Sequence, residues 1–326
     1  MAHPLDFSGV IPQEFSAQII QEAIQQSIVL QLGNILPMGS AITDLPVPKT
    51  LPTASFTGAP GSKKPWTDVM LEPKTVHAEE VAAITAIPDA YLEDSTINLW
   101  GWVRPRLAEA IAVAIDNAVL FGVGAPLTFP RPNAGGLIHA DFCNAVPAVG
   151  IDAVDGVNTA MAMVEAQGIA VTGSAADLIT KSVLRGVRDK NGGLLMGIDQ
   201  VEGRQVPTLY GVPIVYQPWS NVANDFITGG WQNLVIGLRQ DIRYNLDPSG
   251  VVTGAGGQVL LSGFESNTTP LKVWARVGCV IINPVTVKNP NGGKPFSRAR
   301  LATIAPPPDT PLAEDEGGSS RASAKK

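Results

Sequence analysis

Side chains that could carry acid–base or metal chemistry are few and widely spaced in this sequence. The three histidines, His3, His77 and His139, do not stand in a spacing typical of a zinc site or of a Ser-His-Asp arrangement. His77 and Glu79 could share one face of a strand, which would supply two of the three ligands that a metal needs. A solvated strand face is the favoured interpretation, so we expect no metal site.

Acidic and glycine-rich clusters also have structural interpretations. Asp89, Glu93 and Asp94 could form an acid pair, but carboxylates in a first helical turn are the usual response to the helix dipole. The segment TGAGGQ at 253–258 resembles half of a phosphate loop, yet no Gly-Lys-Ser or Gly-Lys-Thr follows, and a hairpin turn is favoured. We therefore expect no catalytic residue, no cofactor and no enzymatic activity.

Composition narrows the classes of protein that remain. Of 326 residues, 45% are hydrophobic and only 16% are charged, with a net charge of −6. The length allows two sizeable domains, and a weakly charged surface favours contacts with partners. The negative charge argues against a broad face that grips nucleic-acid phosphates. Cys143 and Cys279 are too few for a disulfide framework, and we expect neither a secretory signal nor a membrane span.

A strand followed by a long helix, within residues 73–122, is the element around which the chain is organised. The strand is expected at 76–87, with apolar residues on both faces and therefore inside a sheet. The helix is expected at about 95–122, with Glu109 and Asp116 nearly opposite its apolar stripe. The stripe consists of Trp100, Val103, Leu107, Ile111, Ala114, Ala118 and Phe121.

The first turns of this helix contain Gly101 and Pro105. Proline lacks an amide donor and crowds the preceding turn. We therefore expect a kink at these residues, or a fresh helical start near Arg104.

Residues 49–74 contain four prolines and two glycines, and form a long excursion before the strand. A compact monomer rarely contains such a loop, so we expect a projecting hairpin that contacts a partner rather than a mobile surface loop. Phe56 and Trp66 would need a partner to cover them, whereas Lys63 and Lys64 are interpreted as ordinary solubilising residues. The two prolines in 41–48 limit that segment to an edge strand or an extended segment.

A mixed second domain is expected after residue 124, where prolines and glycines become frequent. The clearest strand follows it, at 270–288, with apolar residues alternating against Lys272, Trp274 and Arg276. We expect this strand to return to the first domain beside the long helix, which makes the second domain an insertion. Residues 305–326 form a low-complexity tail that cannot bury enough apolar area to fold alone.

The order of these parts resembles the major capsid proteins of tailed bacteriophages with the Hong Kong 97-type fold. The stretch from VHAEEVAAITAIP through EDS to the spacing of Asp116 and Gly122 is similar to the strand, turn and spine helix of their peripheral domain. LITKSVLRGVRDKNGGLLM followed by LYGVPIVYQP is similar to their axial domain. FESNTTPLKVWARVGCVIINPVTVKNP looks like their returning strand, with its common arginine at Arg276.

The resemblance implies an α+β fold of the Hong Kong 97 type. Residues 1–40 would be an N-terminal arm with a short helix, and 41–125 with 265–300 a peripheral domain. That domain would carry an extended E-loop at 49–75 and a spine helix at about 95–122. Residues 126–264 would form the inserted axial domain, and 301–326 the C-terminal tail.

The same resemblance implies a structural function. The chain would self-assemble as hexamers and pentamers into an icosahedral shell around double-stranded phage DNA, without sequence-specific DNA binding. It would be assembled in the bacterial cytoplasm and reside in the virion, with a separate scaffolding protein, a portal and cement or decoration proteins as partners. The residues expected at inter-subunit contacts are Phe15, Phe56, Lys63, Lys64, Trp66 and Arg276.

Some relatives join a loop lysine covalently to an asparagine of a neighbour, with help from a glutamate. Lys63 or Lys64 could be joined to Asn283 or Asn289, but no glutamate lies near those asparagines in sequence, so we expect no crosslink. Two rival interpretations stay open. One is an encapsulin-type nanocompartment shell with the same fold. The tail and the proline-rich loop favour a phage protein over this alternative. The other is a monomeric α/β enzyme, which is disfavoured because the sequence shows no catalytic constellation.

Overall fold

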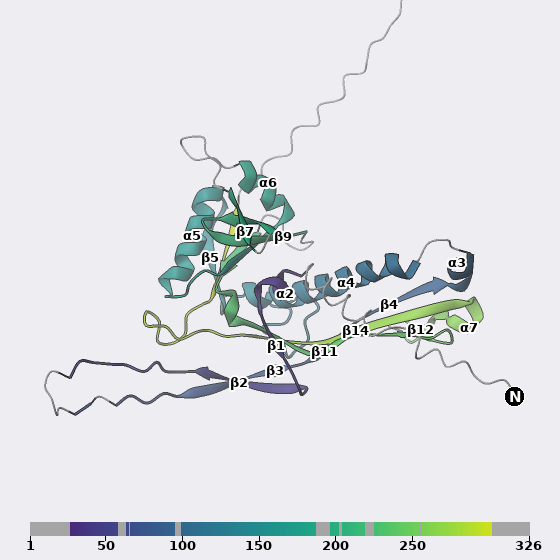
Figure 1. The fold of residues 1–326 in the computed structure, drawn as a ribbon, viewed down its shortest axis with the longest axis horizontal. Coiled ribbons are helices and arrows are strands. Elements are labelled where there is room, and N and C mark those ends of the chain that lie inside the picture. The colour runs from purple at the N-terminus through teal and green to yellow at the C-terminus, as the bar shows by residue number, and fades with distance from the viewer. Residues whose placement is uncertain are drawn as a thin grey trace, which may run out of the picture.

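The computed structural model describes residues 27–57, 63–64, 66–94, 99–186, 196–201, 204–218, 225–254 and 256–301. Figure 1 shows three parts: a compact module, a long flat layer, and a narrow hairpin that extends away from both. Helices α5 (Ala153–Ala166) and α6 (Leu178–Gly186) belong to the compact module, α4 (Leu99–Phe121) lies along the flat layer, and β2 (Ile42–Pro48) with β3 (Leu71–His77) forms the hairpin.

The flat layer contains a four-stranded sheet in the order β1-β11-β14-β4. β14 pairs antiparallel with β11 on one side and with β4 on the other, so the prediction that this strand returns beside the long helix is confirmed. Leu271, Val273, Ala275, Val277, Cys279 and Ile281 of β14 are buried in the same core as α4, and the residues between them face outward. The strands are β1 (Asn34–Pro37), β4 (Glu79–Pro88), β11 (Leu234–Leu246) and β14 (Thr268–Ile281).

β4 is an edge strand, and the prediction that it lies inside a sheet is wrong. Only one of its faces packs against the core, through Val81 and Ala83, while Ile84 on the other face is exposed. The expected single strand at 76–87 is also broken at Ala78, because its N–H bonds to the Ala41 carbonyl at 2.9 Å and turns the chain from β3 into β4.

α4 continues through Pro105 without interruption, so a fresh helical start near Arg104 is wrong, while the kink stays a prediction. The apolar stripe is confirmed at Leu107, Ile111, Ala118 and Phe121, which are buried. It is wrong at Ala114, which is exposed, and Asp116, expected opposite the stripe, is buried. The physical reason is that α4 packs against a second helix as well as the sheet, which widens its buried face. The side chain of Trp100 lies outside the described part.

The compact module is built on a seven-stranded mixed sheet in the order β5-β15-β10-β6-β9-β8-β7. α5 packs against β5, β15 and β10, and α6 packs against β6 and β9. The strands are β5 (Cys143–Ile151), β6 (Gly173–Asp177), β7 (Met196–Val201), β8 (Arg204–Leu209), β9 (Val212–Gln217), β10 (Asp225–Gly229) and β15 (Phe296–Leu301).

Two strands lie in a different sheet from the one expected. β11 falls within the predicted insertion 126–264, yet it pairs with β14 in the flat layer. β15 falls within the predicted second part of the first domain, 265–300, yet it pairs with β5 and β10 in the compact module. The chain therefore passes between the two sheets three times instead of twice. Alternation of apolar and polar residues identifies a strand, but it does not specify the distant strand with which that strand pairs.

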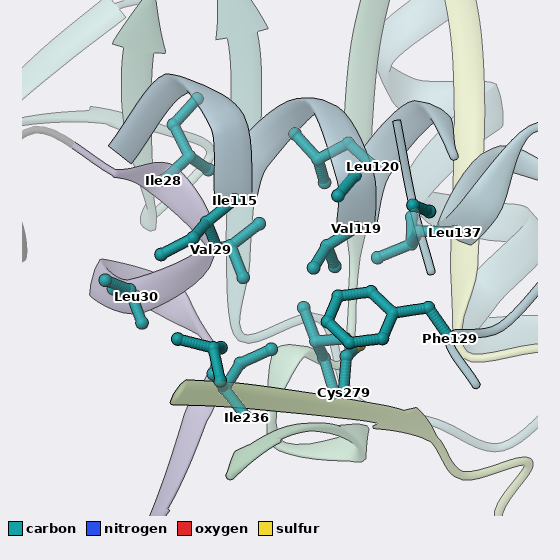
Figure 2. Packing of buried hydrophobic residues seen from close by; sticks show 14 of the residues in the cluster. Ile28, Val29, Leu30, Ile115, Val119, Leu120, Phe129, Leu137, Ile236 and Cys279 are labelled. Carbon is teal, nitrogen blue, oxygen red and sulfur yellow. The ribbon is translucent and has the colours of Figure 1, made fainter. Parts of the chain in front are cut away.

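One hydrophobic core runs through the junction of the two sheets. Figure 2 shows α2 (Ile28–Leu32) placing Ile28, Val29 and Leu30 beside α4, above Ile236 and Cys279 of the flat sheet. From the compact module, Phe296 and Trp231 join the same cluster, and their rings meet edge to face at 5.3 Å. The 3-10 turns at this junction are η2 (Gly136–Ile138) and η3 (Trp231–Asn233).

The far end of the flat layer carries α3 (Asp89–Asp94), a small hairpin of β12 (Val251–Thr253) and β13 (Val259–Ser262), and α7 (Gly263–Ser266) (Figure 1). The predicted hairpin turn at 253–258 is confirmed by this pairing. The Asp89 carboxylate accepts a hydrogen bond from Thr269 Oγ1 at 2.6 Å, which ties α3 to β14. Within the described ranges, no helix is both long and apolar enough to cross a membrane.

Candidate interaction site

The β2–β3 hairpin, residues 42–77, is a two-stranded sheet whose strands pair with each other. Seven residues of each strand are in register, from Ile42 opposite His77 to Pro48 opposite Leu71. Pro46 lies opposite Pro73, and neither has an N–H to donate. Such strands suit a two-stranded ribbon without further neighbours, which confirms the expected edge-strand character of 41–48.

Hydrogen bonds continue along the hairpin beyond its strands. Thr50 Oγ1 accepts the Met70 N–H at 2.9 Å, and Thr67 Oγ1 donates to the Thr53 carbonyl at 3.0 Å. Lys49 and Lys74 lie 3.9 and 3.7 Å from Glu72, but exposed ion pairs of this kind stabilise little. Threonine bonding therefore keeps the two limbs side by side toward the distal end.

The residues expected at contacts lie exposed on this hairpin. Phe56 is 105% exposed and Trp66 is 85% exposed, and Lys63 and Lys64 are exposed as well. Apolar rings in water cost free energy unless another surface covers them. The hairpin thus presents two uncovered aromatic side chains to a partner. Phe15, the expected contact in the arm, lies outside the described residues.

Arg276 lies elsewhere, on the outer face of β14. It is half-buried and stands opposite Glu80 of β4 and Gln240 of β11. Beside it, Lys272 lies 3.6 Å from Glu80 and 5.0 Å from the centre of the Trp274 ring. Because Phe56 and Trp66 are almost fully exposed, neither packs against Arg276, and the structure does not join these residues into one site within a subunit.

Asp116 is the buried residue that helical-wheel reasoning placed on the wrong side of α4. It is 5% exposed and accepts hydrogen bonds from Ser27 Oγ at 2.6 Å, Ile28 N–H at 3.0 Å and Val29 N–H at 3.2 Å. These groups begin α2, so a carboxylate of α4 caps a helix distant in sequence. Burial raises the pKa of Asp116 to about 6, although the three hydrogen bonds oppose this rise.

Gly122 lies six residues after Asp116, and a different physical reason favours glycine at this position. Its φ of +70° favours glycine, and a Cβ there would lie 2.8 Å from the Gly136 nitrogen and 2.9 Å from the Arg131 carbonyl oxygen. The spacing of Asp116 and Gly122 therefore fixes both sides of the last turns of α4: one residue holds α2, and the other lets the chain turn tightly against η2.

A second exposed apolar surface was not predicted. Phe264 of α7 is 82% exposed, and Tyr91 of α3 is also exposed at the same far end of the flat layer (Figure 1). Val251, Val259 and Leu260 on the small β12–β13 hairpin add to it. The high glycine content of 254–257 hid this surface, because the segment was interpreted only as a turn.

The polar groups of the compact module serve structure. Asp225 of β10 is fully buried, accepts a hydrogen bond from Arg300 Nε at 3.2 Å and lies 3.7 Å from Arg298, and burial raises its pKa. Burial also raises the pKa of the Cys143 thiol to about 12, and it raises the pKa of the Cys279 thiol in the flat sheet. Such thiols are poor nucleophiles.

The suggested metal pair and the suggested crosslink partners are engaged in other contacts. Glu79 accepts a hydrogen bond from Thr128 at 2.8 Å and lies on a different strand from His77. Asn283 donates to the Asp141 carbonyl at 3.2 Å, and Asn289 donates to Gln167 Oε1 at 2.7 Å. Across the described part of the chain, no three His, Cys, Asp or Glu side chains are grouped to hold a metal ion.

Comparison with known proteins gives a consistent set of relatives. Residues 8–291 match the model of the Phage capsid family. The chain is 27% identical over 240 residues to the probable major capsid protein gp17 of Mycobacterium phage L5, covering 73% of this chain and 71% of that protein. It is 26% identical over 225 residues to the protein of the same description from Mycobacterium phage D29, covering 69% and 68%.

A solved structure shares the fold. A chain from Mycobacterium phage Adephagia superposes with a TM-score of 0.67 at 24% identity, covering 94% of this chain and 100% of the other. This likeness concerns the arrangement of helices and strands alone.

Proposed function

Because the chain belongs to the phage capsid family, we propose that it is a major capsid protein that assembles as hexamers and pentamers into an icosahedral shell enclosing double-stranded DNA. The single observation that carries the proposal is the β2–β3 hairpin, whose Phe56 and Trp66 are left exposed by the described part of their own subunit. A subunit that tiles a shell can bury such side chains against its neighbours.

The parts of a Hong Kong 97-type subunit can be assigned to the observed elements. We assign the E-loop to the β2–β3 hairpin, the spine helix to α4, the peripheral domain to the four-stranded sheet and the axial domain to the seven-stranded sheet. We also assign β11 to the peripheral part and β15 to the axial part, because of the strands with which they pair. Residues 1–40 would supply the arm, held to α4 through Asp116, and 301–326 the tail.

Phe56, Trp66, Lys63 and Lys64 would then contact a neighbouring subunit, as would Phe15 in the arm and Arg276 on the outer sheet face. Phe56 and Trp66 are the most exposed large apolar side chains in the described part of the hairpin, and aromatic residues are among the types that contribute most to interface energy. We infer that no lysine–asparagine crosslink forms, because Asn283 and Asn289 are hydrogen-bonded within the subunit.

The net charge of −6 fits a shell that encloses DNA without gripping it through a broad basic face. A separate scaffolding protein, a portal and decoration proteins would be further partners. The function would be structural rather than enzymatic, in a virion assembled in the bacterial cytoplasm.

Electron microscopy of the purified full-length chain, produced with and without its scaffolding protein, tests the proposal. We expect shells or hexameric and pentameric capsomers, and DNA inside shells isolated from infected cells. Shells that contain protein cargo and no DNA would favour the encapsulin-type alternative. A stable monomer that never assembles, with or without scaffold, would contradict both. A denaturing gel of mature particles tests the crosslink, since a ladder of covalent multimers would overturn that inference.

A further inference from the structure

Two glycines face each other across β11 and β14 on the outer side of the flat sheet. Gly237 and Gly278 are directly paired in register. Their neighbours Ile236, Val277 and Cys279 are buried toward α4, so the two glycines face away from it. Neither has a positive φ, which means that backbone conformation does not require glycine here. Glycine inside a strand then marks a close approach of other atoms.

The root of the β2–β3 hairpin makes that approach. A Cβ at Gly278 would lie 2.6 Å from the His77 carbonyl oxygen and 2.6 Å from Val76 Cγ1. A Cβ at Gly237 would lie 3.0 Å from Val76 Cγ1 and would overlap the sulfur of Met38. Val76 is 0% exposed, so it fills the space that the missing side chains leave. We call Gly237, Gly278 and the Val76 side chain between them the glycine notch.

The notch is where the root of the hairpin packs against the flat sheet. Within β2 and β3, only Val47 and Val76 are buried. Two backbone hydrogen bonds secure the root, from Met38 N–H to the Leu238 carbonyl at 2.8 Å and from Ala78 N–H to the Ala41 carbonyl at 2.9 Å. In the described distal part, hydrogen bonds join the two limbs of the hairpin to each other. The contact of Val76 with the sheet is therefore the one that can orient the hairpin from its root.

We propose that the glycine notch is a positioning site that holds the hairpin at the angle required to reach a second copy of this chain. The inference rests on the proposed function, because this angle matters only if the hairpin binds a neighbouring subunit. Gly237 and Gly278 do not touch that neighbour themselves. They act by letting Val76 seat against the backbone of the sheet.

The identity of the clashing atoms predicts an order of effects. Gly278→Ala places a methyl group against a backbone carbonyl, which cannot move unless the hairpin root moves with it. Gly237→Ala meets mainly the flexible end of Met38, so its effect is expected to be smaller. Gly39→Ala is the matched control, because Gly39 precedes the same hairpin and no atom lies within 4 Å of its added Cβ.

Distances between spin labels in the unassembled subunit test the position directly. Labels on Met70→Cys in the hairpin and Ile84→Cys on β4 report the angle, since both sites are exposed and both native cysteines are buried. We expect Gly278→Ala to shift the distance distribution, Gly237→Ala to shift it less, and Gly39→Ala to leave it unchanged. An unchanged distribution in Gly278→Ala would overturn the proposal. If Gly278→Ala does not fold, the comparison of Gly237→Ala with Gly39→Ala decides in the same way.

Assembly of the same proteins gives the second measurement. We expect Gly278→Ala to raise the protein concentration needed for shell formation about tenfold, which corresponds to about 1.4 kcal/mol per contact. A shifted hairpin with wild-type assembly would refute positioning by the notch. A wild-type chain that forms no shells would instead refute the proposed function, while the spin-label distances would still decide whether the notch sets the angle.

Discussion

The carboxylate of Asp116 stabilises a helix other than its own. Its oxygens accept the Ser27 hydroxyl and the Ile28 and Val29 amides at the start of α2. A helix of five residues has almost no stability by itself, so α2 depends on this cap and on its packing against α4. Asp116 therefore anchors the point at which the N-terminal segment joins the body of the subunit.

Replacing Asp116 by alanine leaves buried donors without an acceptor. We expect Asp116→Ala to lower the free energy of unfolding of the unassembled subunit by about 3 kcal/mol, measured by urea denaturation. Glu109→Ala on the same helix is the control, because Glu109 is exposed and pairs with Arg106 at the surface, and its effect is expected to stay within about 0.5 kcal/mol. Equal losses in the two variants would show that Asp116 is not an anchor.

The raised pKa of Asp116 makes the stability depend on pH. The folded subunit binds this proton more tightly, with a pKa of about 6, than the unfolded chain, with a value of 3.8. This contribution to stability is therefore complete below pH 3.8 and decreases as the pH rises to about 6. We expect the wild type to lose about 3 kcal/mol relative to Asp116→Asn across that window.

Urea denaturation of both proteins at a series of pH values measures the difference. Asp225, whose pKa is also raised, is present in both proteins and cancels. A difference in unfolding free energy that does not vary with pH would mean that Asp116 titrates normally in the folded subunit.

Helical periodicity predicted α4 itself but not the burial of Asp116. The wheel assigns a charged residue to solvent, whereas here the free amides of another helix provide the polar environment. The Ser27 and Asp116 pair is separated by 89 positions, and neither residue carries a local signal of that contact. By contrast, Leu107, Ile111 and Ala118 are buried as predicted, because apolar burial is a property of the stripe and needs no specific partner.

At the scale of elements, α4 is a continuous helix that lacks one of its backbone hydrogen bonds. Pro105 cannot donate a hydrogen bond to the carbonyl of residue 101, and Gly101 stands at that position. The helix passes through both residues, so it forms despite the free-energy cost of this missing hydrogen bond. We propose that a kink here sets how the helix bends in different subunit positions.

Pro105→Ala restores the missing donor. We expect it to raise the unfolding free energy of the unassembled subunit by about 1–3 kcal/mol and to reduce shell formation, because a straighter helix fits fewer positions. Urea denaturation and electron microscopy measure the two effects. Val113→Ala, at an exposed position of the same helix, is expected to change neither by much. Normal shells from Pro105→Ala would exclude a role of the kink in assembly.

The β2–β3 hairpin could be predicted because its signals are local. Frequent prolines, a long excursion and aromatic residues without a covering partner all lie within one stretch of sequence. The contact of the hairpin with the sheet could not be predicted, since Gly237 and Gly278 are distant from Val76 in the chain. In the sequence alone, each is a glycine that would only weaken its strand.

At the scale of the molecule, the exposed end of the hairpin should matter for association and little for folding. We expect a Phe56→Ser, Trp66→Ser double variant to keep the thermal midpoint of the wild type and to lose shell formation. Leu127→Ser is the control, because Leu127 is 89% exposed but lies outside the hairpin. If the control and the double variant assemble equally well, the hairpin aromatics do not form the proposed contact.

The division into two sheets was only partly predictable. Each strand could be identified from its own alternation, as at β14, but the sheet that it joins depends on partners far along the chain. β11 and β15 were assigned to the wrong sheet for this reason. A single inserted domain is the simplest arrangement of such elements, whereas the chain crosses the junction once more to place β15 between β5 and β10.

Trp231 lies at the junction where the chain crosses between the two sheets. Its indole N–H bonds to the Gly173 carbonyl at 2.9 Å, its backbone N–H bonds to Thr172 Oγ1 at 2.9 Å, and its ring meets Phe296 of β15. Next to it, the Gly230 N–H bonds to the Pro295 carbonyl at 2.9 Å, which clamps two crossing segments together. These contacts tie the segment that leads into β11 to β6 and β15 of the compact module. In the proposed shell, we expect strain from lattice curvature to be taken up where the hairpin and the proline-containing end of α4 extend from the two sheets.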